Sequence, residues 1–360
     1  MTSTGRRDQK PTIRDVAHRA QVSVATVSRV LAGNYPTSAA SQARVRKAVA
    51  DLDYVANAHA RALSSRRSNT VAIVLANVTT PFYAAVAQGA QDEAARQGRL
   101  CLIGTTGGDA ARELATIELL REQGAETVVL VGGFHRTPEH YERLAPYATS
   151  LAAVGSRLVL CARPGLGPDA PAHVVTYDNE HGAFAAVSHL LSYGHRRVLL
   201  VGGREGWTTS DDRVAGWRRA LGAHGAQADP GLLVLGEFGD AFGYRRVSER
   251  LAQTGGEPDF TAVFAYDDHV ALGVLRALRE AGLRVPHDVS VVGYDDVPLA
   301  AHLAPALTTV SVPMEELGRT AVRVGLDPGA SPTGSVVLGT HLVLRDSVEH
   351  AATRRPAARE

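Results

Sequence analysis

The sequence predicts a molecule of two parts, a small all-α helix-turn-helix unit followed by a larger α/β body of two lobes with parallel sheets. Three observations support this division. Charge is unevenly distributed, three short amphipathic helices precede residue 56, and apolar runs alternate with helix-period segments from residue 70 onwards. At roughly 100–200 residues per domain, a chain of 360 residues has room for two or three domains.

The charge differs between the two parts of the chain. The whole sequence has 38 Lys and Arg against 37 Asp and Glu, a formal net charge of +1. Residues 1–68 hold 12 Lys or Arg and four Asp, a balance of +8, which leaves 26 basic and 33 acidic residues, or −7, for the other 292. A basic unit joined to an acidic body is typical of polyanion binding, although a solvated basic tail would have the same charge.

The composition excludes several classes of protein. Hydrophobic residues make up 45% of the chain, so wholesale disorder is excluded. No apolar run reaches the ~18 residues of a membrane span, and the N-terminus lacks the apolar region of a secretory signal. Cys101 and Cys161 are the only cysteines, which excludes a disulfide scaffold and a Cys-based zinc site. We therefore expect a cytoplasmic protein without membrane contact.

The N-terminal unit is predicted to contain three helices. Thr12 and an acid three residues later mark the first helix start, and Ile13, Val16, Ala17 and Ala20 place apolar side chains on one face. Ser23 can cap a second helix that runs to about Leu31, where Gly33–Pro36 ends it. A third helix fits about Ser41 to Leu52. Three short helices with a tight turn between the first two predict a helix-turn-helix domain.

The second helix has two distinct faces. At about 100° per residue, Val27, Val30 and Leu31 cluster on the side that should pack inward. The opposite arc carries Val24, Ala25, Ser28 and Arg29, of which Arg29 suits guanine and the two apolar residues suit a thymine methyl. Short hydroxyl donors suited to phosphates are Thr12, Ser23, Thr26, Ser38, Ser41 and Tyr54. Each hydroxyl could instead be a helix cap, and Arg29 a surface charge.

The body repeats a strand and helix pattern. Apolar runs predict strands at 71–76, 100–103, 128–131, 174–177, 198–201, 232–235, 262–265 and 289–292, and helix-period segments cover 83–97, 110–123, 182–193, 212–224 and 269–281. We predict two lobes, with crossovers near Arg163–Ala172 and near Ala304–Thr308. The expected boundaries are 1–56 for the helical unit, 57–69 for a linker, 70–348 for the body and 349–360 for a disordered tail. Lobe 1 would hold about 70–173 plus 305–332, and lobe 2 about 174–304 plus 333–348.

The residues that follow the predicted strands indicate a ligand site, because ligands of open parallel sheets bind beyond the carboxyl ends of the strands. Those residues are small or polar: Asn77, Gly104, Gly132, Asp178, Gly202, Asp267 and Asp295. Nearby aromatic residues that could stack on a sugar or base are Phe82, Tyr83, Trp207 and Phe238. Arg213 is predicted at a helix start, where the helix dipole does not favour a cation. Ordinary turn and cap residues would show the same pattern.

Three segments of the N-terminal region resemble a known family. Thr12–Ala17, Val22–Leu31 and Leu52–Asn57 are similar to the DNA-binding headpiece of the LacI/GalR family of bacterial transcription regulators. The resemblance implies base reading by Val24, Ala25 and Arg29. It implies backbone contacts by Thr12, Ser23, Thr26, Ser28, Ser38, Ser41, Tyr54 and Asn57. Asn57–Leu63 matches the family's hinge helix, in which Ala60 and Leu63 would face the minor groove and the leucine would unstack the central base step. Ala56 replaces the usual Pro before the hinge Asn.

The body extends the same resemblance over about residues 12–348. Asn77–Tyr83, Tyr177–Asn179, Ser210–Trp217 and Val291–Asp296 look like the family's effector-binding domain, which is periplasmic-binding-protein-like. The resemblance implies effector contacts from Phe82, Tyr83, Asp178, Arg213, Phe238, Asp267 and Asp295. Asp267 stands where the family usually has Asn, and a carboxylate in that place favours a ligand that offers hydroxyls or an amine.

The predicted function is that of a homodimeric repressor that binds a pseudo-palindromic double-stranded DNA operator. A small molecule in the cleft between the lobes, a sugar or sugar derivative in the first instance, would set operator affinity. The alternative is a sugar-binding protein without a regulatory role. The sequence contains no P-loop, no Gly-x-Ser-x-Gly and no His-Glu-x-x-His, so we expect no enzyme, no cofactor and no metal. His195 and the paired acids 211–212, 267–268 and 295–296 are interpreted as loop and cap residues.

Overall fold

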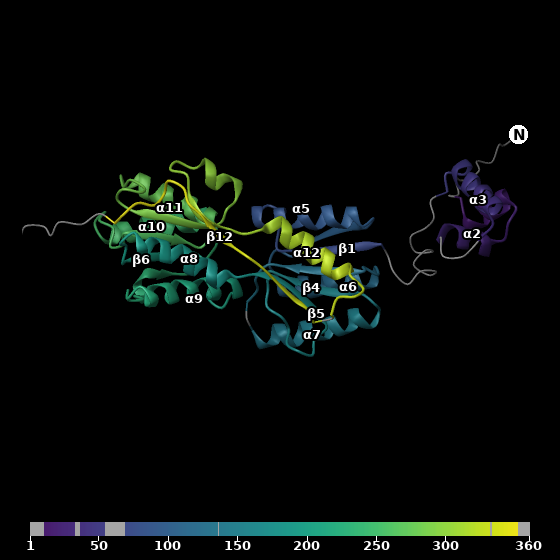
Figure 1. Ribbon diagram of the computed structural model, residues 1–360, viewed down its shortest axis with the longest axis horizontal. Coiled ribbons are helices and arrows are strands. Elements are labelled where there is room, and N and C mark those ends of the chain that lie inside the picture. Colours follow the sequence, from purple (N-terminus) through teal and green to yellow (C-terminus); the bar gives the residue numbers. More distant parts are fainter. Residues whose placement is uncertain (1–10, 33–36, 55–68, 136, 332, 352–360) are drawn as a thin grey trace, which may run out of the picture.

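The computed structural model describes residues 11–32, 37–54, 69–135, 137–331 and 333–351. In these ranges three N-terminal helices are followed by two α/β lobes (Figure 1). The described residues form two sheets of six strands each, and helices cover both faces of the sheets. Each sheet belongs to one lobe, which confirms the predicted fold class.

The N-terminal helices are α1 (Ile13–Ala20), α2 (Val24–Ala32) and α3 (Ala39–Asp51). The Thr12 backbone N–H and hydroxyl both donate to the Asp15 carboxylate, at 2.8 and 2.7 Å, and this fixes the start of α1. The third helix begins earlier than predicted because the Ser38 side chain, rather than a later residue, caps it. Val16, Val27 and Val45, one from each helix, are completely buried and form the centre of a small core.

Lobe 1 is built on an all-parallel sheet in the order β11-β5-β4-β3-β1-β2. Its strands are β1 (Thr70–Leu75), β2 (Leu100–Thr105), β3 (Thr127–Val131), β4 (Arg157–Cys161), β5 (Ala172–Tyr177) and β11 (Ser335–Leu338). Its helices are α5 (Pro81–Arg96), α6 (Ala110–Glu122), α7 (Pro138–Ala153) and α12 (Met314–Leu326). The late helix α12 lies along the early helix α5 (Figure 1). A Cβ at Gly318 would stand 2.0 Å from the Val86 carbonyl oxygen, so glycine is what permits this backbone contact.

Lobe 2 is built on a sheet in the order β12-β10-β9-β8-β6-β7, in which only β12 is antiparallel to its neighbour. Its strands are β6 (Val198–Val201), β7 (Leu233–Val234), β8 (Ala262–Ala265), β9 (Ser290–Asp295), β10 (Thr308–Ser311) and β12 (His341–Val343). Its α-helices are α8 (Asn179–Ser192), α9 (Thr208–Ala223), α10 (Asp240–Gln253) and α11 (Asp268–Glu280). Short 3₁₀ turns occupy Pro230–Leu232 and Pro298–His302.

The chain crosses between the lobes at other places than the sequence predicts. It crosses at residue 178 between β5 and α8, at 312–313 between β10 and α12, and at 339–340 between β11 and β12. The Pro/Gly-rich stretch 163–172, predicted as a crossover, instead joins β4 to β5 within one sheet. The predicted lobe boundaries therefore misassign β5, β10 and β11. The error arose because a loop rich in Pro and Gly breaks a helix but does not by itself mark a change of lobe.

The C-terminal segment begins with residues that pack on lobe 2. Glu349 accepts a hydrogen bond from His195 Nε2 through its carbonyl oxygen at 3.0 Å, and the His350 ring stacks on Tyr193 with centroids 4.5 Å apart. The prediction of disorder over 349–360 is therefore wrong for 349–351, and 352–360 lie outside the described residues. His195 also bonds Thr261 and Ser290, at 3.0 and 3.1 Å, so its interpretation as a loop hydrogen-bonding residue is confirmed.

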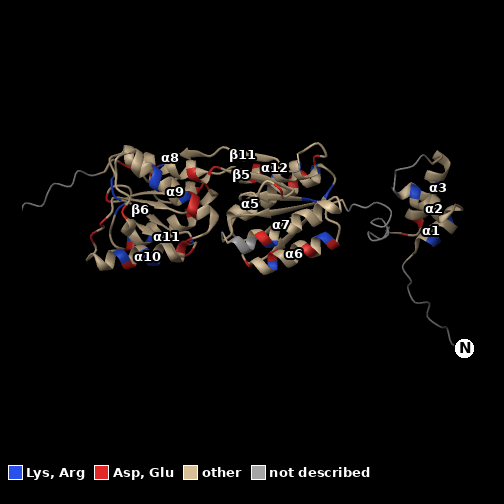
Figure 2. Ribbon diagram, turned by 90° about the horizontal axis from the view of Figure 1, so that it is seen from below, with Lys and Arg blue, Asp and Glu red and all other residues tan. Residues whose placement is uncertain are grey.

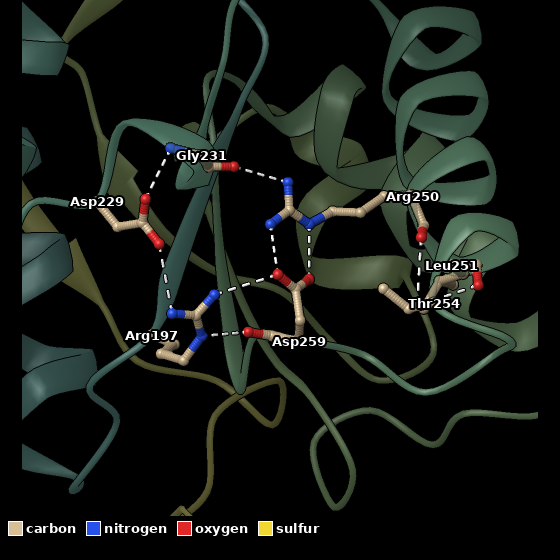
Figure 3. Close-up of polar contacts among 7 residues, drawn as sticks. All are labelled: Arg197, Asp229, Gly231, Arg250, Leu251, Thr254 and Asp259. Atoms are coloured by element: carbon tan, nitrogen blue, oxygen red, sulfur yellow. Dashed lines mark hydrogen bonds and ion pairs between the residues drawn. The ribbon is translucent and has the colours of Figure 1, made fainter.

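Four charged side chains connect the elements at the end of lobe 2 away from the strand carboxyl ends (Figure 3). Two nitrogens of Arg250 donate to the two carboxylate oxygens of Asp259 at 2.7 and 2.6 Å. Arg197 joins Asp259 to Asp229. The network ties the end of α10 to the segments that enter β6 and β8. Both arginines lower the pKa of the Asp259 carboxyl.

Candidate DNA-binding surface and inter-lobe ligand site

Helix α2 presents the predicted base-reading residues on its exposed face. Val24 is 42% exposed, and Ala25 and Arg29 are also exposed, whereas Val27 is completely buried. Ser28 is half-buried beside them. The described part of the headpiece carries six Lys or Arg against three Asp, so it is basic even without residues 1–10 and 55–68 (Figure 2). The predicted base-reading residues are therefore accessible on a basic headpiece, as contact with DNA requires.

Two of the predicted phosphate-contacting hydroxyls, those of Ser23 and Ser38, cap helices. The Thr26 backbone N–H donates to the Ser23 hydroxyl at 3.1 Å, and the Ser41 N–H donates to that of Ser38 at 3.3 Å. Thr12 pairs with Asp15, and Tyr54 is only 9% exposed in the small core. Contact with phosphate would therefore require the hydroxyls of Thr12, Ser23 and Ser38 to exchange or share their present partners. Asn57, Ala60, Leu63 and Ala56 lie outside the described residues.

A cavity of about 270 Å³ lies between the carboxyl ends of the two sheets. Lobe 1 contributes Ala76, Asn77, Thr80, Phe82, Tyr83, Gly107, Gly108, Gly132, Gly133, Ala162 and Tyr177, and lobe 2 contributes Arg204, Trp207, Thr209, Arg213, Phe238, Tyr266, Asp267 and Asp295. Aromatic rings of lobe 2 cluster on one side of it: Trp207 lies edge-on to Phe238 at 5.9 Å between centroids, and Phe238 lies 5.1 Å from Tyr266. The position agrees with the rule that parallel sheets bind ligands at this edge.

The cavity brings together six of the seven predicted effector residues, Phe82, Tyr83, Arg213, Phe238, Asp267 and Asp295. Asp178 is not among them. Its side chain is exposed at the crossing to lobe 2 and accepts the His181 backbone N–H at 2.8 Å, which caps α8. Sequence reasoning missed Tyr177, Tyr266, Thr209 and Arg204. Tyr177 is the last residue of β5, and an aromatic residue at a strand end is a signal by which sequence reasoning could have found it.

Arg213 is the central side chain of the site and lies inside α9 rather than at a helix start. It is 3% exposed. Its Nε donates to Asn179 Oδ1 at 3.0 Å, and its other nitrogens donate to the Tyr266 carbonyl, the Tyr177 hydroxyl and the Asp295 carboxylate. The guanidinium carbon lies 3.7 Å from the centroid of the Tyr294 ring. Arg213 thus joins elements of both lobes, since Tyr177 belongs to lobe 1 and the others to lobe 2.

The pKa values of two carboxyl groups in the cavity are raised, which favours their neutral form. Burial raises the pKa of Asp295 to about 7, against the opposing effect of Arg213. Burial likewise raises the pKa of Asp267, whose Oδ1 caps α11 by accepting the Val270 N–H at 2.7 Å. A protonated carboxyl both donates and accepts, whereas an ionised one only accepts. Near neutral pH the Asp295 side chain can therefore satisfy a ligand hydroxyl in either role.

The backbone around the cavity is held in unusual conformations. Asp295 has a φ of +104° and Ala162 a φ of +56°, both in the region that L residues rarely adopt. Such residues cost of order 1–3 kcal/mol each and cluster at functional sites. Asp295 pairs with Arg213 at 3.1 Å, and the next residue, Asp296, pairs with Arg345 at 2.7 Å.

Other features of the described residues do not indicate chemistry. A larger cavity of about 730 Å³ lies on lobe 2 between α10, α11 and residues 303–305, but no predicted effector residue lines it. Among the described residues, no group of three or more His, Cys, Asp or Glu could hold a metal ion, and no helix is long and apolar enough to cross a bilayer. The paired acids diverge as predicted: Asp267 faces the cavity, while Asp268 accepts the Thr309 hydroxyl at 2.6 Å.

The chain matches two described families. Residues 12–57 match bacterial regulatory proteins, lacI family, and residues 187–348 match a periplasmic binding protein-like domain. The HTH-type transcriptional regulator CelR of Thermobifida fusca is 34% identical over 349 residues, which covers 95% of this chain and 99% of the relative. The ribose operon repressor of Haemophilus influenzae is 30% identical over 340 residues, which covers 94% and 98%.

Two solved structures extend this similarity. A transcriptional regulator CelR–cellobiose complex has a TM-score of 0.69 at 32% identity and covers 94% of this chain and 99% of that chain. The lac repressor dimer bound to operator and the anti-inducer ONPF has a TM-score of 0.79 at 24% identity and covers 95% and 100%. The second likeness shows the fold alone.

A basic helix-turn-helix unit attached to a two-lobed domain with a cavity between its lobes defines a ligand-binding transcriptional regulator. The chain belongs to the LacI family of bacterial regulatory proteins, because relatives at 30% identity or more match it over nearly its whole length. It is a DNA-binding transcriptional regulator and not an enzyme. The alternative of a sugar-binding protein without a regulatory role is not supported, since the family match includes the headpiece.

Proposed function

We propose that this regulator is a cytoplasmic repressor whose operator affinity is set by a sugar bound in the inter-lobe cavity. The observation that carries the proposal is the convergence of Arg213, Asp267 and Asp295 with aromatic rings from both lobes on one cavity. An occupant of that cavity touches both lobes, so its binding free energy depends on how they are closed. Such coupling between sites is typically worth ~1–3 kcal/mol and acts equally in both directions.

The sugar is favoured by the chemistry of the cavity walls. Hydroxyl groups need partners that donate and accept, which Asn77, Asp267 and Asp295 supply. The apolar faces of a sugar ring need flat aromatic surfaces, which Trp207 and Phe238 supply. A solved structure that is 32% identical is a complex with cellobiose, and a relative that is 30% identical is a ribose operon repressor, which supports the same class. A nucleoside is the second candidate.

The DNA complex is proposed to use the headpiece and the linker together. Val24, Ala25 and Arg29 would read bases from the exposed face of α2. The hydroxyl side chains described above and Asn57 would contact the backbone and set the register. Ala60 and Leu63 would enter the minor groove when two hinge segments meet on the operator. Two headpieces side by side require a pseudo-palindromic site.

A second copy of this chain is the proposed partner of the edge strand β2. Leu100, Leu102 and Ile103 are 62%, 37% and 47% exposed on that strand. An unpaired apolar edge strand is an aggregation risk that proteins normally cover. A homodimer would cover this strand. The solved structure of the lac repressor, which has a similar fold, is a dimer bound to operator. Leu102→Lys is expected to shift the sedimentation coefficient towards that of a monomer, and an unchanged dimer would exclude this edge as the interface.

The test combines ligand screening with operator binding. A thermal-shift screen of the full chain against monosaccharides, disaccharides, polyols and nucleosides identifies ligands, and fluorescence anisotropy with a palindromic operator then measures their effect on DNA affinity. We expect one sugar class to raise the melting temperature and to change operator affinity by roughly 5–150-fold. Phe238→Ala is expected to keep operator affinity and lose this response. If no small molecule changes operator affinity, the proposal fails.

A further inference from the structure

Two loops join the lobes directly beside the inter-lobe cavity. One loop, 132–135, follows β3 of lobe 1, and the other, 206–209, leads into α9 of lobe 2. The Thr208 backbone N–H donates to the Phe134 carbonyl oxygen at 3.0 Å, and the Phe134 N–H donates to the Thr208 hydroxyl at 3.3 Å. His135 and Trp207 form an isolated antiparallel bridge next to them. We call these two loops the clasp, since the lobes cannot separate at this point without breaking it.

The clasp packs side chains of lobe 2 on a bare backbone of lobe 1. A Cβ at Gly133 would stand 2.5 Å from Trp207 Nε1 and 2.9 Å from Thr209 Oγ1. Glycine is therefore what lets these two side chains rest on the loop. Such close packing loses much of its attraction when a gap of ~0.5–1 Å opens. The strength of the clasp thus depends on where the loop 132–135 is held.

Arg163 holds this loop from inside lobe 1. It follows β4, and its side chain is 3% exposed. Its Nε donates to the Gly132 carbonyl oxygen at 2.8 Å, and one of its terminal nitrogens donates to the Val131 carbonyl oxygen at 3.2 Å. The guanidinium carbon lies 5.4 Å from the centroid of the Phe134 ring. One buried side chain therefore contacts the end of β3 and the loop that continues from it.

Glu113 fixes the orientation of Arg163. It lies in the first turn of α6, and its side chain is 10% exposed. Arg163 donates to both of its carboxylate oxygens at 3.0 Å. A bidentate pair holds the planar guanidinium in one orientation, so the donors to the two backbone carbonyl oxygens are held in place as well. A lysine has no such planar fork and could not make this set of contacts.

We propose that Arg163 is a positioning residue for closure of the lobes: held by Glu113, it places the loop 132–135 and thereby sets the strength of the clasp. Neither Arg163 nor Glu113 is among the residues that line the inter-lobe cavity, whereas Gly132 and Gly133 of the loop do line it. Arg163 therefore acts through the loop and not on the ligand. The consequence for ligand response rests on the proposed function, since a ligand that touches both lobes binds more tightly when the clasp holds them together.

The two tryptophans of the chain supply a probe for the clasp. Trp207 lies in the clasp, whereas Trp217 is 1% exposed in the core of lobe 2 and donates to the Val198 carbonyl oxygen at 3.1 Å. Acrylamide, a collisional quencher of fluorescence, should reach Trp207 more readily when the clasp opens and should not reach Trp217 in the folded protein. Quenching of the full-length protein without ligand therefore measures opening of the clasp.

Replacement of Arg163 tests the proposal. Arg163→Met removes the donors to both carbonyl oxygens, and it should raise the quenching constant roughly twofold or more, since exposure of Trp207 follows the population of the open state. Arg163→Lys keeps a positive charge beside Glu113 but lacks the planar fork, so quenching should lie between wild type and Arg163→Met. It also replaces Arg163→Met if that variant does not melt cooperatively. Gly133→Ala opens the clasp directly through its contact with Trp207 and should raise the quenching constant to a similar extent.

Arg99→Met is the matched control in the same lobe. Arg99 also joins a glutamate to a backbone carbonyl oxygen, since it donates to Glu126 at 2.8 Å and to the Gln97 carbonyl oxygen at 3.0 Å. It precedes β2, however, and so lies at the opposite end of the sheet from Arg163. This variant should leave the quenching constant unchanged, even where it lowers the melting temperature.

Three results would overturn the inference. Wild-type quenching in both Arg163 variants would show that the clasp does not depend on Arg163, and wild-type quenching in Gly133→Ala would show that the lobes do not depend on the clasp. An equal rise in Arg99→Met would show that general loosening of lobe 1 exposes Trp207. None of these measurements involves a ligand. A failed sugar screen would therefore overturn the proposed function and leave the role of Arg163 in closure standing.

Discussion

Replacement of Arg213 is the most informative perturbation of the cleft. Arg213→Ala removes hydrogen bonds to Asn179, Tyr266, Tyr177 and Asp295, and it leaves the Asp295 carboxyl buried without its cation. Breaking a buried ion pair by removing one partner costs ~3–5 kcal/mol. Since typical unfolding free energies are ~5–15 kcal/mol, the variant should remain folded at low temperature but unfold at clearly lower urea concentration.

The loss of stability should depend on pH. In the wild type the folded-state pKa of Asp295 is about 7, above its ordinary value of 3.8. Its contribution to stability is therefore fully present below pH 3.8 and is lost as pH rises towards 7. Arg213 lowers this pKa, so in Arg213→Ala it rises further and the loss continues above pH 7. The free energies of unfolding of wild type and variant should differ by a constant amount up to about pH 7. Above that pH the difference should grow, reaching ~1.4 kcal/mol more for each unit by which the substitution raises the pKa of Asp295.

Urea unfolding at pH 6 and pH 8, followed by circular dichroism, measures both effects. The matched control is Arg219→Ala, since Arg219 lies on the same helix, is 46% exposed and pairs with Glu180 at the surface. Exposed pairs are worth ~0–1 kcal/mol, so this variant should lose little. An equal loss for Arg213→Ala at both pH values would show that packing, not charge pairing, dominates. A loss no larger than that of the control would refute the central role of Arg213.

Three further predictions concern other parts of the molecule. Arg29→Ala should cost ~1–3 kcal/mol of operator affinity and relax preference at one base position, measured by anisotropy with single-base operator variants; a uniform loss across variants would indicate a phosphate contact instead. Gly318→Ala should lower the melting temperature, because its Cβ would stand 2.0 Å from a carbonyl oxygen of α5 and overpacking costs ~1–3 kcal/mol; Gly222→Ala, with nothing within 4 Å, is the control and should not be destabilised. The pKa of Asp259 is lowered by its arginines, so its contribution to stability is present above pH 3.8 and lost as pH falls through the lowered value; Asp259→Asn should therefore flatten the acid side of a melting-temperature profile, and an unchanged profile would contradict this.

The headpiece could be predicted closely because its signals are local. Helix starts depend on caps within three residues, and Thr12, Ser23 and Ser38 provide them. The inward and outward faces of α2 follow from helical periodicity alone, and the burial of Val27 confirms the inward face. The exception is the start of α3, where two serines three residues apart offered two possible caps.

The body was predicted less completely because its connections are not local. Strand β4 was missed, since no helix separates it from β5 and the expected alternation fails there. Strands β11 and β12 are short, and β11 is a half-exposed edge strand whose burial alternates, so it shows no apolar run. Which lobe a strand joins depends on its pairing partners, and for β11 the partner β5 lies more than a hundred positions away, which no periodicity records.

The prediction of the site relied on which residues stand at strand ends, and this limits how precisely it could place their side chains. Position at a strand end does not give the direction of a side chain, so Asp178 was included although it turns to cap α8. Arg213 was assigned to the cleft by its place near a predicted helix start and by the family resemblance, and neither gave a sign of its burial or of its four partners. Both depend on how α8 and α9 pack, which is a property of the assembled lobe.

The threefold crossing of the chain between the lobes has a consequence for synthesis. Lobe 1 receives β11 and α12 from the last part of the sequence, so its sheet stays incomplete, and the β5 edge unpaired, until residues up to Leu338 have been made. At ~5–20 residues per second, the roughly 160 residues that separate β5 from the end of β11 take about 8–32 seconds on the ribosome. During that interval the headpiece can already be folded while lobe 1 still lacks two of its elements. Chaperones that bind the growing chain therefore encounter a parallel sheet with an unpaired edge. Truncations near the C-terminus should damage lobe 1, although most of that lobe is synthesised first.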